Sequence, residues 1–153
     1  MKTQLAFKIA IFIAVALLGL TARGQEMEKL KLTDEEIPAG YKPSSKMLCQ
    51  SVQAASFYAQ TDVYEALLGT VKNKSYQSFE TKGDKGTILY LEYEEDFKGE
   101  AFLQGLLWGE KDKPTKAHPE EYLVIGKYLV IWSFSPDSKL KKFSKEKILQ
   151  ALN

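Results

Sequence analysis

Apolar residues recur with helical spacing in several stretches of the chain and alternate with polar residues in others. Leu48, Val52 and Ala55 share one stripe, which predicts a helix beginning near residue 47, although residues 52–58 also fit a strand. An Asp-x-x-Glu capping box predicts a shorter helix further on. Four helices are predicted in this way: one from about residue 47, one at 62–68, one at 98–108, and a C-terminal one from Ser144 or from an earlier start near Ser135.

The strand pattern is clearest where the sequence Tyr-Leu-Val-Ile occurs twice, ending at Ile125 and beginning again at Tyr128, around the dipeptide Gly-Lys. Glycine in the first position of a two-residue turn suits a type II′ β-hairpin. The resulting register pairs Ile125 with Tyr128 and Leu123 with Val130. We expect this hairpin inside a sheet, because an exposed edge this apolar invites aggregation. The predicted strands are residues 75–81, 86–94, 121–125 and 128–134.

These elements predict an α+β protein of two layers, with helices packed on an antiparallel sheet of about four strands. Both faces of the last hairpin are apolar, so either helices cover both faces of the sheet or one face is a binding surface. Pro38 and Pro43 disfavour a helix before the first predicted one. The expected organisation is a signal peptide at 1–24, an extended lead-in at 25–43 and a single α+β domain at 44–153.

The first residues have the three parts of a secretory signal peptide. Lys2 and Lys8 provide a positive start, residues 9–20 form an uninterrupted apolar run, and Ala-Arg-Gly at 22–24 has the small-x-small pattern of a cleavage site. The apolar run is shorter than the roughly 20 residues that span a bilayer. We therefore expect cleavage after Gly24, a secreted or periplasmic protein, and a mature chain with no transmembrane segment.

Composition narrows the classes of partner and of chemistry. Cleavage would remove Lys2, Lys8 and Arg23, which changes the net charge from +1 to about −2. A nearly neutral chain whose only arginine leaves with the signal gives no reason to expect a nucleic-acid partner. The single cysteine, Cys49, excludes an intramolecular disulfide, and we expect it to be a small, buried apolar side chain.

The sequence contains few residues that are typical of a catalytic or metal site. Its one histidine, His118, lies in a polar loop, and the P-loop, dinucleotide-binding and Gly-x-Ser-x-Gly motifs are missing. One histidine and one cysteine do not make the clustered ligands of a zinc site, so we predict no metal and no cofactor. The catalytic alternative is a small hydrolase that uses Glu92 or Glu94 together with His118.

Aromatic residues indicate a candidate ligand-binding surface. Tyr128, Trp132 and Phe134 share one face of a predicted strand, and Tyr90 is expected nearby in the sheet. Such side chains can bind a protein, a glycan or an apolar ligand. They can equally form the core beneath a helix.

The leading hypothesis is a non-catalytic, exported binding or interaction module. It would use the aromatic face or the cleft between the helix at 98–108 and the hairpin at 121–134. A further alternative is an envelope-associated structural protein, in which a basic C-terminal helix docks on an anionic surface. The lysines that would do so are Lys139, Lys141, Lys142, Lys145 and Lys147.

Overall fold

The computed structural model describes residues 26–151, so the predicted signal peptide lies outside the described residues. The chain divides into two units, Met1–Lys31 and Leu32–Asn153. In the first unit, residues 26–30 are helical, and Lys31 Nζ lies 2.5 Å from Glu28 Oε1. The elements below all belong to the second unit.

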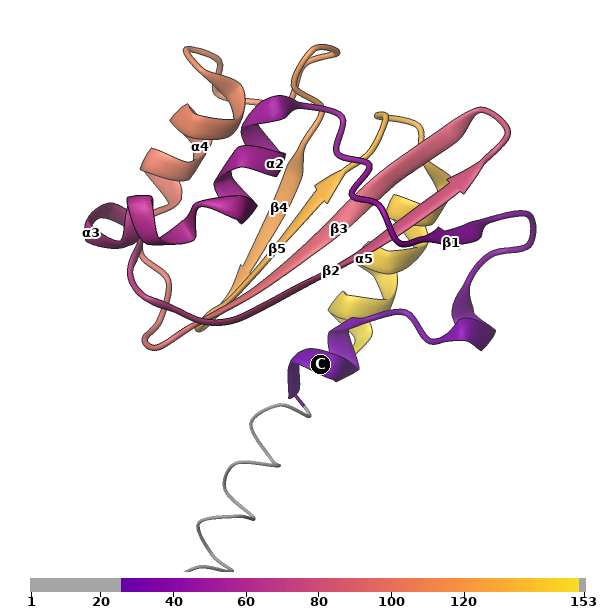
Figure 1. Cartoon of the computed structure of the whole chain (residues 1–153), viewed down its shortest axis with the longest axis horizontal. Helices are drawn as coiled ribbons and strands as arrows, with labels where there is room; N and C mark the ends of the chain where they lie inside the picture. Colours follow the sequence, from indigo (N-terminus) through magenta and orange to yellow (C-terminus); the bar gives the residue numbers. More distant parts are fainter. Residues whose placement is uncertain (1–25, 152–153) are drawn as a thin grey trace, which may run out of the picture. The chain divides into compact units, whose positions relative to one another are not determined.

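The second unit is built on a five-stranded antiparallel sheet with the strand order β1-β2-β3-β5-β4 (Figure 1). The predicted antiparallel sheet is confirmed. One short strand, β1, was not predicted and comes from the end of the segment that we expected to be an extended lead-in. The strands are β1 (Lys42–Ser44), β2 (Val71–Thr81), β3 (Asp84–Tyr93), β4 (Glu121–Ile125) and β5 (Tyr128–Ser133).

Helices lie on both faces of this sheet (Figure 1). The α+β class is confirmed, and the C-terminal helix adds a layer to the two that the pattern predicted. Among residues 26–151, none of the helices is long and apolar enough to cross a membrane. The helices are η1 (Asp34–Glu36), α2 (Val52–Ala59), η2 (Thr61–Tyr64), α3 (Glu65–Leu68), α4 (Glu100–Trp108) and α5 (Lys139–Ala151).

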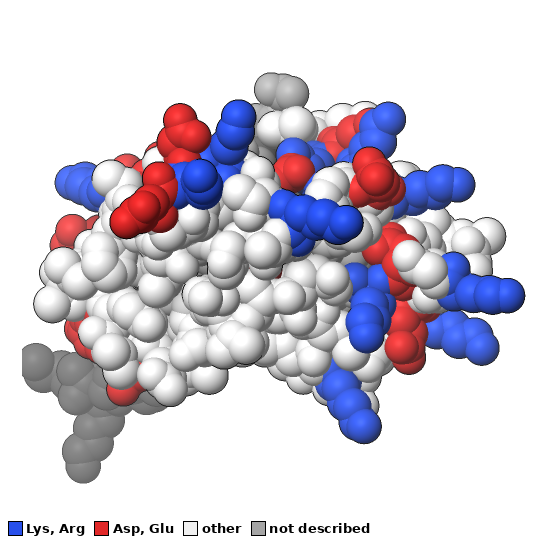
Figure 2. All heavy atoms as spheres, turned by 90° about the horizontal axis from the view of Figure 1, so that it is seen from above, with Lys and Arg blue, Asp and Glu red and all other residues white. Residues whose placement is uncertain are grey.

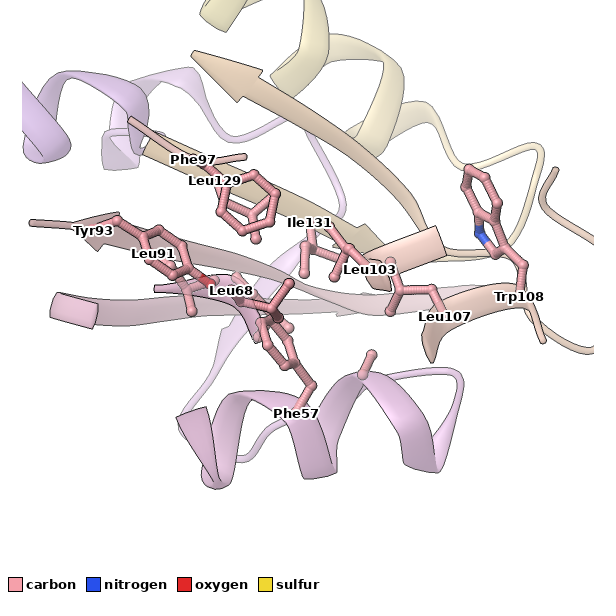
Figure 3. Close-up of a cluster of buried hydrophobic side chains, with 12 residues drawn as sticks. Phe57, Leu68, Leu91, Tyr93, Phe97, Leu103, Leu107, Trp108, Leu129 and Ile131 are labelled. Carbon is pink, nitrogen blue, oxygen red and sulfur yellow. The ribbon is translucent and has the colours of Figure 1, made fainter. Parts of the chain in front are cut away.

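The main apolar core fills the space between the sheet and the helices α2, α3 and α4 (Figure 3). Alternate residues of β3 and β5 point to this face because side chains alternate along a strand. Each fully buried leucine stabilises the fold by roughly 1.5–3 kcal/mol. The strand residues of this core are Leu89, Leu91, Tyr93, Leu129 and Ile131, and the helix residues include Phe57, Leu68, Leu103 and Leu107.

Serine side chains cap two of the helices. Ser51 Oγ accepts a hydrogen bond from the Ala54 amide at 3.2 Å, and Ser138 Oγ accepts one from the Lys141 amide at 3.2 Å. The later predicted start of the C-terminal helix, at Ser144, is therefore wrong. Ser144 lies within α5 and is fully buried, since it faces the sheet rather than the end of the helix.

The predicted helix over residues 62–68 is divided in the structure. Its first part is the 3₁₀ helix η2, and its second part is the single-turn helix α3. The expected capping box is not formed, because the Asp62 segment begins with a 3₁₀ turn in which Val63 N–H donates to Gln60 O at 3.1 Å. The expected stop at Gly69 is confirmed by its φ of 93°.

The two strands of the last hairpin have different positions in the sheet. β5 lies between β3 and β4, but β4 is an edge strand, so the expectation that the whole hairpin lies inside the sheet is wrong. The predicted register is confirmed: Ile125 pairs with Tyr128 and Leu123 pairs with Val130. Gly126 has a φ of 56°, which the tight turn requires. The pattern of side chains indicated which faces are covered, but not whether the strand has a neighbour on each side.

Candidate functional site

Most of the aromatic residues that the sequence indicated as a binding surface lie in the core. Tyr90, Trp132 and Phe134 are each 0% exposed, and Tyr128 is half-buried. Trp132 lies beneath α5, where its indole Nε1 donates to Ser144 Oγ at 3.0 Å. Because α5 covers this face of the sheet, a ligand would reach Trp132 only if the helix moved away.

Glu92 and His118, two of the three residues of the hydrolase hypothesis, lie toward opposite ends of β3. Through β5, strand pairing aligns Glu121, which follows His118 closely in the chain, with Ile88. Ile88 and Glu92 are four positions apart, about 13 Å along a strand. The Glu92 carboxylate is fully buried and lies 2.6 Å from Lys127 Nζ. This arrangement engages Glu92 in an ion pair and does not bring it to His118.

Cys49, which precedes α2, lies in a small polar cluster with Thr87 of β3 and Ser133 of β5. Burial raises the pKa of its thiol to about 11, although hydrogen bonds with Ser133 and Thr87 act in the opposite direction. Ser133 Oγ in turn donates to Glu120 Oε1 at 2.8 Å, and Glu120 is fully buried. A thiol that stays protonated at neutral pH is a poor nucleophile, so the cluster fits a structural role. Within residues 26–151, no three His, Cys, Asp or Glu side chains form a group that could hold a metal.

An open groove of about 650 Å³ lies at the outer edge of β4, where we predicted a cleft between a helix and the last hairpin. One wall is residues 121–124 of β4. The other walls come from Glu100 and Trp108 of α4, Pro114 of the following loop, and Lys145 of α5. The groove therefore combines the main chain of an edge strand with side chains from the helices on both faces of the sheet.

Apolar and aromatic groups line the α4 side of the groove. The rings of Trp108 and Tyr122 lie 5.7 Å apart between their centroids. Trp108 Nε1 donates to the Glu120 carbonyl at 2.8 Å, which ties α4 to the start of β4. Tyr122 and Val124 pack against the core beneath them while they remain half-buried. The groove is thus a firmly held surface with accessible apolar groups.

Ion pairs hold the α5 side of the groove. Glu121 Oε1 accepts a hydrogen bond from Lys141 Nζ at 2.9 Å, and Glu121 Oε2 is paired with Lys145. Burial raises the pKa of Glu121, but the hydrogen bonds and charges of Lys145 and Lys141 outweigh this effect and lower it. Lys147 is likewise paired, with Glu36. Part of the basic charge that was expected to meet an anionic surface is therefore neutralised within the protein.

The two edges of the sheet differ in their protection against pairing with another strand. On the opposite edge, β1 is three residues long and contains Lys42 and Pro43, two residue types that natural proteins use to block an edge. Residues 71–77 of β2, which β1 does not cover, contain two lysines, Lys72 and Lys74, and a register shift. The β4 edge is five residues long, and every residue after Glu121 is apolar or aromatic. All of its residues are half-buried rather than covered. Of the two sheet edges in residues 26–151, the β4 edge alone lacks lysine, proline and an irregular register.

A second exposed apolar surface lies over the helices α2, α3 and α4. Figure 2 shows a broad area without charged side chains in the left half of the view, the side on which these helices lie in Figure 1. Val52, Val63, Leu67 and Phe102 are the large exposed apolar residues of this layer, and Val52 is 80% exposed. Unlike the groove, this surface presents no free strand edge.

No family model, curated protein or solved structure matches this chain. The candidate site therefore rests on the geometry of the protein itself. The sequence indicated the region of the groove but not the individual residues 121–124 as binding residues. The two apolar faces of the hairpin indicated that residues 121–124 pack on both sides, but this pattern carries no signal for the free edge of the strand.

Proposed function

We propose that this protein is an exported, non-catalytic interaction module and that its binding site is the groove along β4. The observation that carries the proposal is the position of β4: an apolar strand at the edge of the sheet, beside an open groove. An edge strand offers main-chain hydrogen bonds, and neighbouring side chains select the partner. A polypeptide partner in an extended conformation fits such a site.

Three features favour binding over catalysis. Glu92 is engaged by Lys127, and His118 lies toward the other end of the sheet. The pKa of Cys49 is raised, which opposes its use as a nucleophile. The groove itself presents an ion-paired carboxylate, Glu121, and a hydrogen-bonded phenol, Tyr122. These groups are occupied by neighbours, as is usual for residues that shape a surface.

Export is the part of the proposal that rests on the N-terminal sequence alone. Its support is the positive start, the apolar run at 9–20 and the small residues at 22–24. Cell fractionation followed by mass spectrometry of the intact protein tests it. We expect a mature chain that begins at Gln25 in the secreted or periplasmic fraction. A full-length chain in the cytoplasm would contradict export.

The binding function is tested by capture from native envelope and secreted fractions, with residues 25–153 as bait. The Leu123→Lys variant places a charge on the β4 edge, and the Val63→Lys variant places one on the exposed helix layer, where Val63 is 64% exposed. Circular dichroism establishes that both variants fold. We expect a specific partner that Leu123→Lys loses and Val63→Lys keeps. Equal capture by both variants would show that the groove is not the binding site.

A further inference from the structure

We infer that the strand that occupies the groove is β4 of a second copy of this chain, so that two five-stranded sheets join across a two-fold axis. This inference rests on the proposed function, since it names the partner of the same groove. Three observations support it. The main-chain groups of two β4 residues point away from the sheet, β4 can pair with a second β4 in an antiparallel register, and the two edges of the sheet differ in their protection.

The main-chain groups of Tyr122 and Val124 point away from the sheet. The Tyr93 amide donates to the Lys127 carbonyl at 2.8 Å, so the residues of β5 at the same parity as Lys127 face β3. The intervening ones, including Val130, face β4, because main-chain groups alternate along an antiparallel strand. Leu123, which pairs with Val130, therefore makes its main-chain hydrogen bonds with β5. Its neighbours Tyr122 and Val124 direct theirs outward, into the groove.

An antiparallel register centred on Leu123 satisfies these outward groups in both copies. Tyr122 then lies opposite Val124 of the second copy, and Val124 lies opposite Tyr122 of the second copy. Each of these facing pairs exchanges both main-chain hydrogen bonds. Leu123 faces its own counterpart as a non-hydrogen-bonded pair, whose Cα atoms are about 4.5 Å apart. A strand whose free groups flank one central residue is self-complementary in this way.

Side chains and charges also agree with this register. Tyr122 and Val124 meet on the face of the sheet that α4 covers, which sets an aromatic ring against a β-branched side chain. The single charged residue of β4, Glu121, lies opposite Ile125 of the second copy. The two Glu121 side chains, each with its Lys141 and Lys145, are then four strand positions apart, about 13 Å. Like charges are therefore kept away from the centre of the interface.

The two edges of the sheet predict where a second copy binds. Lys42 and Pro43 protect β1. Residues 71–77 of β2, which β1 leaves uncovered, carry Lys72, Lys74 and a register shift, so this edge offers a partner strand no equivalent apolar site. At β4, the groove of about 650 Å³ leaves room beside the strand. Pairing at β4 alone gives a closed dimer, because a two-fold interface uses the same surface of both copies.

Cysteine cross-linking tests the register directly. We would replace Leu123 by cysteine in a Cys49→Ser background of residues 25–153, which removes the natural thiol. A Cα separation of about 4.5 Å lies within the range of a disulfide, so mild oxidation is expected to give a covalent dimer. The matched control is Ile125→Cys in the same background, since its two copies would lie about 13 Å apart. Cross-linking of both variants alike, or of neither, would overturn this register.

Light scattering after size-exclusion chromatography separates this inference from the proposed function. We expect the unmodified residues 25–153 to have the mass of a dimer and the folded Leu123→Lys variant to have the mass of a monomer. A monomeric wild type that captures another protein, which Leu123→Lys loses, would overturn the second copy but leave the groove as the binding site. A monomeric wild type whose capture is unaffected by Leu123→Lys would overturn both.

Discussion

The indole nitrogen of Trp132, on β5, donates a hydrogen bond to Ser144 Oγ, on α5, at 3.0 Å, and both side chains are fully buried. This contact fixes the C-terminal helix over the aromatic face of the sheet. It also explains why a polar serine lies on the inner face of that helix. A buried indole N–H needs an acceptor, and Ser144 is the residue that supplies it.

The Ser144→Ala variant should destabilise the protein by about 1–3 kcal/mol, because it leaves the buried Trp132 N–H without an acceptor. Urea unfolding followed by circular dichroism measures this loss. The control is the same substitution in a Trp132→Phe background, where no N–H remains. The cost of Ser144→Ala should be clearly smaller there. An equal cost in both backgrounds would mean that the hydrogen bond contributes nothing measurable.

The ion pair of Glu92 with Lys127 should make the stability of the protein depend on pH in the acidic range. Burial raises the pKa of Glu92, but hydrogen bonds from Lys127 and Asn73 and the charge of Lys127 lower it to below its usual 4.5. The folded-state pKa is thus below that of the unfolded chain. The pair therefore stabilises the fold fully above about pH 4.5, and the contribution is lost as the pH falls through the folded-state pKa.

The Lys127→Met variant should lose roughly 3 kcal/mol of stability at pH 7, because it leaves the Glu92 carboxylate buried without its cation. The difference from the wild type should shrink on acidification, as Glu92 takes up a proton in the variant. Denaturant unfolding across a pH series measures both effects. Lys98→Met is the control, since Lys98 is exposed and its loss should change stability by less than about 0.5 kcal/mol. A pH-independent difference would contradict the role of the ion pair.

The thiol of Cys49 should react slowly with iodoacetamide in the folded protein. Its pKa is raised from 9.0 to about 11 by burial, and the thiolate is the reactive form. At pH 8 we expect a rate about 100-fold below that of the unfolded chain, which corresponds to the two-unit difference in pKa. Because the folded-state pKa is the higher one, stability should fall as the pH rises from about 9 to about 11. A reaction midpoint near pH 9 in the folded protein would contradict this environment.

Alanine substitution at two glycines, Gly86 and Gly105, should change the stability of the protein in opposite directions. A Cβ on Gly86 would lie 2.3 Å from the Ser133 carbonyl oxygen and 2.5 Å from the Phe134 ring, so Gly86→Ala should destabilise by about 1–3 kcal/mol. A Cβ on Gly105, in α4, would meet no atom within 4 Å, so Gly105→Ala should stabilise by about 0.5–1 kcal/mol. Thermal or urea unfolding of the two variants gives the comparison. Equal effects would mean that the close approach of β5 to β3 is relieved by movement.

Local features of the chain were sufficient to predict much of the secondary structure. The pairing of Ile125 with Tyr128 followed from the repeated apolar tetrapeptide and from glycine in the turn. Ser144 is a residue at which the local signal is misleading. A serine before a charged and apolar segment is typical of a helix cap, but Ser144 instead serves as an acceptor for Trp132, twelve residues earlier. A contact with a different element outweighed the local signal.

The candidate site could be predicted only in part for the same reason. The spacing of Tyr90, Trp132 and Phe134 fits a buried core face and a binding face equally well. These side chains are buried because α5 covers their face of the sheet. The cleft beside the last hairpin was predicted in position. That β4 forms the edge of the sheet was not, because the alternation of side chains describes the two faces of a strand and not its two edges.

The sequence by itself determined the four longer strands and the approximate positions of the main helices, together with the register of the last hairpin and the lack of a disulfide, since these depend on near neighbours and on composition. It did not determine β1 or the starts of α2 and α5. Only the tertiary structure decided the strand order, the burial of Trp132 beneath α5, and the pairing of Glu92 with Lys127. Those features depend on contacts between residues far apart in the chain. Many arrangements of the same segments satisfy the local pattern, and packing of the whole domain selects one of them.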